Sequence, residues 1–170
     1  MFIVETKPAP ETAKLLKRVE RFIGSVPPHF SLFATLNPKR FEMFLNEIFY
    51  LSMHKTINPD FFAFIRFYVA SKENFKYCYK FNTILLLNKE YTQEQLNRFE
   101  KETSTLPLDE RHLLLLNTAI KALEEPKNFT DKDIQEAKNL GWSDADIFDA
   151  IDHGAFLYKF SKILKAYSKN

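Results

Sequence analysis

The chain has 170 residues, a length that suits one domain with a substantial buried core. Its 24 basic and 22 acidic residues give a formal net charge of +2, so no strong field indicates a nucleic-acid or anionic-membrane partner. The single cysteine, Cys78, excludes a disulfide framework, and the three glycines provide no hairpin signals. We therefore expect an all-α protein of the reducing cytoplasm, without a secretory signal or a membrane span.

Residues 1–10 hold two prolines and are expected to form an N-terminal arm, and residues 11–170 a single all-α domain of about seven or eight helices. Apolar residues at helical spacing define the elements, and prolines, glycines and capping residues mark their ends. The candidate helical segments, which include a possible short one at 29–36 and a central stretch interrupted at 72–74, cover about residues 15–23, 29–36, 38–54, 59–71, 75–87, 92–102, 107–125, 130–140 and 143–164.

Three capping signals support these boundaries. Asn37-Pro38 and Asn58-Pro59 each place a capping amide before a proline at the first helical position, where its missing N–H costs nothing. Thr92 with Gln95 has the spacing of a capping box. The helix after Asn58 is therefore expected to begin at Pro59.

The stretch 58–82 is the most apolar and aromatic part of the chain, which predicts a helix buried on all sides. Arg66 is the only charged residue in the apolar run 61–70. An unpaired buried guanidinium is costly, so Arg66 must pair with a carboxylate or reach an edge, and we expect a paired core arginine. Binding of an anionic ligand is the alternative.

Cys78 is the residue with the most obvious chemistry. A lone buried cysteine most often acts as a small hydrophobic side chain, and that is the favoured interpretation. A reactive thiol needs a lowered pKa, from a nearby cation or a helix N-terminus. Lys76 and Lys80 flank Cys78 by two residues on either side and so fall on other helix faces. Cys78 and Asn82, four residues apart, share a face.

The four histidines have no metal-ligand spacing with one another or with Cys78, so neither a metal nor another cofactor is expected. His153 lies among acidic residues and is expected to be a surface residue with local hydrogen bonds. The segment 130–151 has a helix, a glycine turn and a helix, but Asp144, Asp146 and Asp149 on the second helix would repel phosphates. Nucleic-acid binding is therefore not expected.

Three segments together resemble a known family: GSVPPHF with the following SLFATLNPKRFEMF, the central FFAFIRFYVASKENFKYCYKFN, and the closing FTDKDIQEAKNLGWSDADIFDAI. The chain resembles the alkylhydroperoxidase D-like, or carboxymuconolactone decarboxylase, family, and in particular its peroxidase-related branch. The resemblance covers most of the chain. It implies a multi-helix bundle that assembles into homotrimers or hexamers.

In active members the central region carries a glutamate, a C-x-x-C pair of thiols and a histidine, which form a proton relay. With Cys78 at the second cysteine, the resemblance places Ala63 at the glutamate, Phe75 at the first cysteine and Asn82 at the histidine. Alanine accepts no proton, phenylalanine forms no disulfide and an asparagine amide does not titrate near neutral pH. The motif is therefore degenerate.

Two functions follow from this degenerate motif. The first is a member without disulfide-cycling peroxidase activity, which serves as an oligomeric protein or binds an apolar small molecule. The alternative is an antioxidant enzyme, a one-cysteine thiol peroxidase in which an external thiol resolves the sulfenic acid formed at Cys78. The sequence alone does not decide between them.

Overall fold

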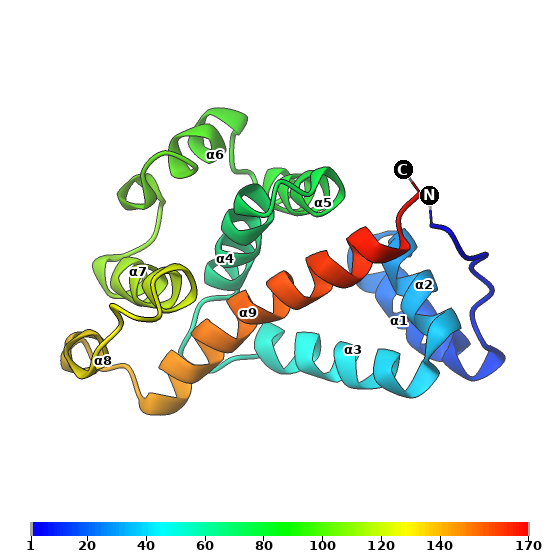
Figure 1. Cartoon of the computed structure of the whole chain (residues 1–170), viewed down its shortest axis with the longest axis horizontal. Coiled ribbons are helices and arrows are strands. Elements are labelled where there is room, and N and C mark those ends of the chain that lie inside the picture. The colour runs from blue at the N-terminus through cyan, green and yellow to red at the C-terminus, as the bar shows by residue number, and fades with distance from the viewer. Residues whose placement is uncertain (1, 170) are drawn as a thin grey trace. The chain divides into compact units, whose positions relative to one another are not determined.

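The computed structural model describes residues 2–169, and these form an all-α fold, as expected (Figure 1). Nine α-helices lie within this range, one more than the upper expected number, together with two short 3-10 helices. The elements are η1 (Pro10–Thr12), α1 (Ala13–Ile23), α2 (Pro28–Leu36), α3 (Pro38–Ser52), α4 (Pro59–Lys72), α5 (Lys76–Leu87), α6 (Gln93–Phe99), η2 (Thr103–Thr105), α7 (Glu110–Glu124), α8 (Asp131–Asn139) and α9 (Asp144–Tyr167).

The described chain divides into two compact units. The first unit contains residues 2–53 and 163–169, and the second contains His54–Lys162. Most of α9 therefore belongs to the second unit and its last residues to the first. The expected boundary between an arm and a domain at residue 10 stays a prediction.

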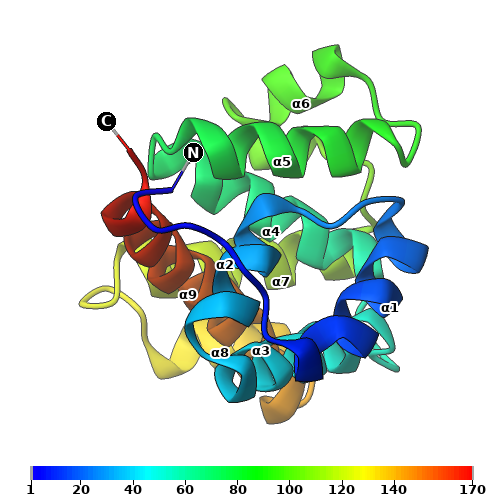
Figure 2. The same cartoon turned by 90° about the vertical axis from the view of Figure 1, so that its right-hand side faces the viewer.

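Aromatic side chains form the centre of the first unit. Phe30 of α2 meets Phe44 of α3 edge-to-face, with ring centroids 5.1 Å apart, and Phe41 lies fully buried beside them. At the start of the described chain, the Ile3 amide donates to the Tyr167 carbonyl at 2.8 Å. Figure 2 shows this blue segment beside the red end of α9. The segment is thus tied down by backbone hydrogen bonding.

The second unit is built around α4, which is buried on nearly every side, as its composition predicts. Phe61, Phe64 and Phe67 are all fully buried. Phe67 stacks on Phe99 of α6, with ring centroids 5.7 Å apart, and Phe64 meets the same ring edge-on. Burial of such rings stabilises the fold by a few kcal/mol each.

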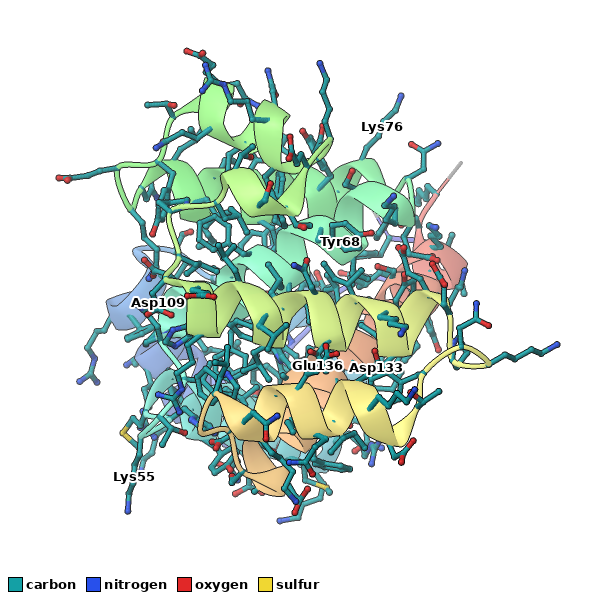
Figure 3. The ribbon with its side chains drawn as sticks, turned by 90° about the vertical axis from the view of Figure 1, so that its left-hand side faces the viewer. Lys55, Tyr68, Lys76, Asp109, Asp133 and Glu136 are labelled. Atoms are coloured by element: carbon teal, nitrogen blue, oxygen red, sulfur yellow. The ribbon has the colours of Figure 1, made fainter. Side chains whose placement is uncertain are left out.

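The capping signals place most helix starts correctly. The Asn37 and Asn58 side chains accept from the backbone amides of Arg40 and Asp60, and Thr92 forms its capping box with Gln95. The expected start of α7 at Pro107 is wrong by three residues, because Asp109 is the N-cap and accepts from the His112 amide at 2.8 Å. Figure 3 shows Asp109 at the start of α7.

Helices α7 and α8 lie side by side in the second unit (Figure 3). Asp133 of α8 forms a capping box with Thr130 at the start of its own helix. Its carboxylate also pairs with Lys121 of α7, with 2.5 Å between the carboxylate oxygen and Nζ. The Trp142 indole N–H, just beyond α8, donates to the Arg111 carbonyl at 2.9 Å. These contacts fix the hairpin that leads into α9.

Gly154 allows α9 to approach its neighbours closely. A Cβ atom at this position would lie 2.3 Å from Leu123 Cδ1 and 3.0 Å from Ile65 Cδ1. The Gly154→Val substitution is therefore expected to lower the free energy of unfolding by about 1–3 kcal/mol, because the branched side chain overfills this contact. Urea denaturation measures the change, and Ala155→Val, at an exposed neighbour in the same helix, is the matched control. Equal losses in the two variants would contradict the steric explanation.

No helix in residues 2–169 combines the length and the apolar character needed to cross a membrane.

Candidate functional site

The residues that the resemblance assigns to the motif lie on α4, at the N-cap of α5 and on α5, and these two consecutive helices run side by side (Figure 1). A short polar turn joins them, and Asn74 adopts a positive φ of 48° there, a conformation that asparagine tolerates well. Phe75 follows as the N-cap of α5. The turn therefore brings the face of α4 that carries Arg66 toward α5.

Arg66 links three helices of the second unit. Its Nε donates to Asn82 Oδ1 of α5 at 3.2 Å, and its Nη1 lies 2.9 Å from His153 Nε2 of α9. The Asn82 amide nitrogen in turn donates to the Cys78 carbonyl at 2.9 Å. We call Arg66, Asn82 and His153 the arginine centre. Asn82, the residue at the expected histidine position, thus acts as a bridge between Arg66 and the backbone of α5.

His153 is a buried residue, not the surface residue expected from its acidic neighbours. Only 1% of its surface is exposed, and its ring lies 5.2 Å from Phe62 and 5.5 Å from Phe156, measured between ring centroids. Because Arg66 can only donate, His153 Nε2 must be the acceptor, so the ring is neutral with its proton on Nδ1. Burial, followed by the charge of Arg66, lowers the pKa of His153 well below its usual value.

The expectation that Arg66 pairs with a carboxylate is wrong. No carboxylate of residues 2–169 forms an ion pair with its guanidinium, whose protein partners are the neutral Asn82 and His153. Burial lowers the pKa of Arg66 to about 10, so the side chain remains charged at neutral pH. The centre therefore holds a positive charge without a protein counter-charge.

The other positions that the resemblance assigns to the motif are Cys78, Ala63 and Phe75. Cys78 is the third residue of α5 and is 5% exposed, and Ala63, on α4, is 2% exposed. Phe75 is partly buried at the N-cap of α5 and has no thiol to pair with Cys78. The structure brings Cys78, Asn82 and Arg66 together, but it does so through the Cys78 carbonyl rather than its sulfur.

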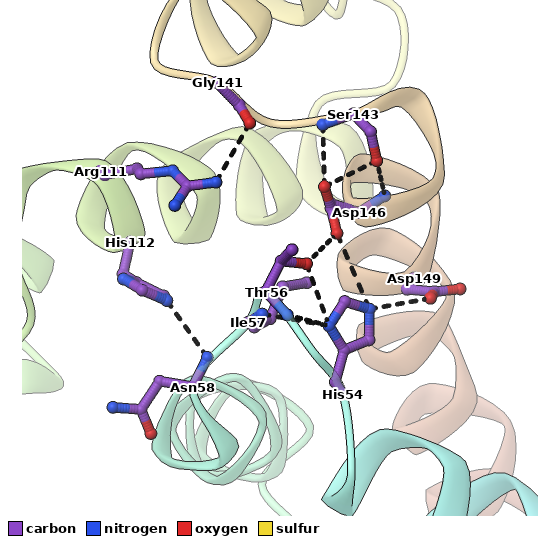
Figure 4. A network of polar contacts seen from close by, with 10 residues as sticks. All are labelled: His54, Thr56, Ile57, Asn58, Arg111, His112, Gly141, Ser143, Asp146 and Asp149. Carbon is purple, nitrogen blue, oxygen red and sulfur yellow. Dashed lines mark hydrogen bonds and ion pairs between the residues drawn. The ribbon is translucent and has the colours of Figure 1, made fainter.

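A second polar network joins the loop before α4 to the start of α9 (Figure 4). His54 Nδ1 accepts from the Ile57 amide at 3.1 Å, which leaves Nε2 to donate to Asp149 at 3.2 Å. Asp146 accepts from the Thr56 hydroxyl and from the Ser143 amide, the latter at 2.8 Å. Each of these polar groups hydrogen-bonds to protein, so we interpret the network as structural and call it the latch. No group of three metal-ligating side chains gathers anywhere in residues 2–169.

No family model matches the sequence, and no curated protein matches it. Solved structures do. An uncharacterised peroxidase-related protein from a Silicibacter species superposes with a TM-score of 0.81 at 18% identity, covering 98% of this chain and 89% of that one. The chain has the alkylhydroperoxidase-like fold. A second structure, described as an alkylhydroperoxidase AhpD core of an uncharacterised peroxidase-related protein from Ralstonia eutropha, gives a TM-score of 0.80 at 15% identity, with coverages of 96% and 88%.

The alkylhydroperoxidase-like fold was expected from the three sequence segments, and the comparisons confirm it over nearly the whole chain. What the sequence did not indicate is the arginine centre. Arg66 and His153 lie 87 residues apart in sequence, and nothing in the sequence around either residue predicts their contact. The one available signal was the isolated charge of Arg66 within an apolar helix.

Proposed function

We propose that this protein has lost the disulfide-cycling peroxidase chemistry associated with its fold and serves as an oligomeric protein that binds a small molecule. One observation carries the proposal: the position expected for a second thiol is Phe75, and Cys78 is the only cysteine of the chain. A thiol pair is needed to reduce a peroxide and then close a disulfide within one chain. The absence of that pair removes the cycle.

The other two replaced positions support the same function. Ala63 and Asn82 are buried, and neither side chain can take up or release a proton near neutral pH. Asn82 is also committed at both ends of its amide, to Arg66 and to the Cys78 carbonyl. The arginine centre occupies the neighbourhood where the resemblance expects a relay, which favours ligand binding over redox turnover.

Peroxide turnover tests the proposal. The purified protein is expected to consume no tert-butyl hydroperoxide above the buffer rate with dithiol or thioredoxin-type donors, measured by the loss of peroxide. A Phe75→Cys variant restores the C-x-x-C spacing and is the positive control, because oxidation should lower its intact mass by the two hydrogens of a disulfide. Steady donor-dependent turnover by the unmodified chain would overturn the proposal.

A second function has one structural feature in its favour. Cys78 lies in the first turn of α5, where the partial positive charge of a helix N-terminus stabilises a thiolate. In a one-cysteine cycle, this thiolate would attack the peroxide, break its O–O bond, release the alcohol and become a sulfenic acid. An external thiol would convert the sulfenic acid to a mixed disulfide and water, and a second external thiol would then release the Cys78 thiol. Its burial opposes this function.

Intact-mass analysis separates the two functions. After limiting peroxide, the one-cysteine enzyme would gain one oxygen atom or one thiol adduct at Cys78. We expect neither adduct in the native protein, because Cys78 is buried, with 5% of the residue's surface exposed. A Cys78→Ser variant identifies any adduct that forms elsewhere, for example on a methionine. Adduct formation that disappears in this variant would favour the enzyme.

A further inference from the structure

The arginine centre has more hydrogen-bond donors than acceptors. The guanidinium of Arg66 has five N–H donors, and protein acceptors take only two of them, Asn82 Oδ1 and His153 Nε2. The remaining ring nitrogen of His153, Nδ1, carries a proton because Nε2 is an acceptor, and it is fully buried with no partner. Unsatisfied buried donors are rare in native proteins and need an explanation.

The arginine centre also lacks a negative charge to balance Arg66. Arg66 is cationic, and its two protein partners are neutral. A cation with limited access to water and no counter-charge is costly, and the cost is repaid when an anion binds. The uncompensated charge of Arg66 and its unused N–H donors would both be relieved by a ligand that brings negative charge and lone pairs.

Arg66 is only partly buried. Arg66 Nη2 has no protein partner, yet it is not among the fully buried unpartnered atoms of residues 2–169, which are Arg111 Nε, His153 Nδ1 and Ser161 Oγ. Nη2 therefore retains accessible surface. Nη1, by contrast, is held by His153, and Nε by Asn82, so these two contacts fix the plane of the guanidinium and orient Nη2 in advance.

The surroundings of the centre are aromatic. His153 is flanked by the rings of Phe62 and Phe156, and the neighbours of Arg66 along α4, Ile65 and Phe67, are fully buried. An inorganic ion would match only the charge. A carboxylate on a small hydrocarbon or aromatic group matches both the cation and its apolar setting, because planar carboxylates fit guanidinium geometry.

We propose that Arg66, oriented by Asn82 and His153, binds the carboxylate of a small apolar organic acid. This inference rests on the proposed ligand-binding function and deepens it by naming the ligand class. Arg66 is the binding residue, and Asn82 and His153 are positioning residues that hold the guanidinium without neutralising it.

Calorimetric titration of the whole protein with sodium benzoate tests the inference, with benzyl alcohol as an uncharged molecule of similar shape. Benzoate is expected to bind with a Kd of about 1 mM or tighter, and benzyl alcohol at least tenfold more weakly. Arg66→Gln should weaken benzoate binding at least tenfold, and Arg66→Lys by less, since it keeps the charge but loses the planar fork. Arg40→Gln, which removes an exposed charge from α3, is the control for net charge.

A second measurement covers the case in which the Arg66 variants do not fold. In the unmodified protein, benzoate should shift the Arg66 side-chain Nε–H signal in nuclear magnetic resonance spectra, and benzyl alcohol should not. Equal binding of the two probes, or benzoate binding that Arg66→Gln leaves unchanged, would overturn the inference. Absence of binding by both probes would also overturn it, while leaving the absence of peroxide turnover intact, so the two failures are distinguishable.

Discussion

Mild acid is expected to destabilise the protein well before its carboxylates titrate. The cause is the burial of two histidines, His153 and His29, which the fold keeps neutral. Burial and the adjacent Arg66 charge lower the pKa of His153 well below 6.5, and burial lowers the pKa of His29 to about 3. Just below pH 6.5 each histidine therefore stays neutral in the folded state, whereas the same side chain takes up a proton in the unfolded chain.

The direction of the effect follows from proton binding. Below pH 6.5 the unfolded state takes up a proton at His153 that the folded state does not, so the free energy of unfolding falls as the pH falls. The loss is about 1.4 kcal/mol per pH unit for each such histidine, and it continues until the folded-state pKa is reached. Above pH 6.5 both states are neutral at this site, and the contribution no longer changes with pH.

Urea denaturation between pH 7.5 and pH 4.5 measures this loss. Below pH 6.5 a His153→Gln variant should have a shallower dependence than the unmodified protein, by up to about 1.4 kcal/mol per pH unit, because it has one histidine fewer to protonate. His29 remains in the variant and keeps part of the slope. Comparison of slopes, rather than absolute stabilities, separates titration from packing loss. Identical slopes in the two proteins would show that His153 is not held neutral by the fold.

Local chemistry made the helices of this chain predictable. The capping amides of Asn37 and Asn58 act within three residues of their own positions, and so does the Thr92 capping box, so a short sequence window contains the whole cause. The start of α7 was misplaced for a related reason. Pro107 and Asp109 are both start signals, and the side chain of Asp109 decides because it reaches the His112 amide.

The site depends on contacts that no local window contains. The assignment of Ala63, Phe75 and Asn82 to motif positions is a prediction from the resemblance, and it gives no hint that Asn82 bridges Arg66 and the Cys78 carbonyl. His153 was expected at the surface because its sequence neighbours are acidic. Asp152 is exposed and Asp149 bonds to His54, so neither determines the environment of His153. The burial of His153 is set by α4, which lies far from it in sequence.

A large loss of stability is expected on removal of the Asp146 carboxylate. One oxygen accepts from the Ser143 amide and hydroxyl, at 2.8 Å and 2.6 Å, and caps α9; the other accepts from the Thr56 hydroxyl and lies 3.8 Å from His54 Nε2 (Figure 4). Burial alone would raise the pKa of Asp146, but hydrogen bonds from Ser143 and Thr56 outweigh it and lower the pKa, so the carboxylate is charged.

Asp146→Ala is expected to lower the free energy of unfolding by about 3 kcal/mol, because it leaves buried donors of the latch without an acceptor and removes a helix cap. Asp146→Asn keeps one acceptor oxygen and should lose about half as much. Asp152→Ala, at an exposed position of the same helix, should change the stability by less than about 0.5 kcal/mol. Urea denaturation at pH 7 compares the three. If Asp146→Ala were as mild as Asp152→Ala, the latch that joins the loop 54–58 to α9 would contribute nothing to the stability of the second unit. The start of α9 would then have to be held by its apolar contacts alone.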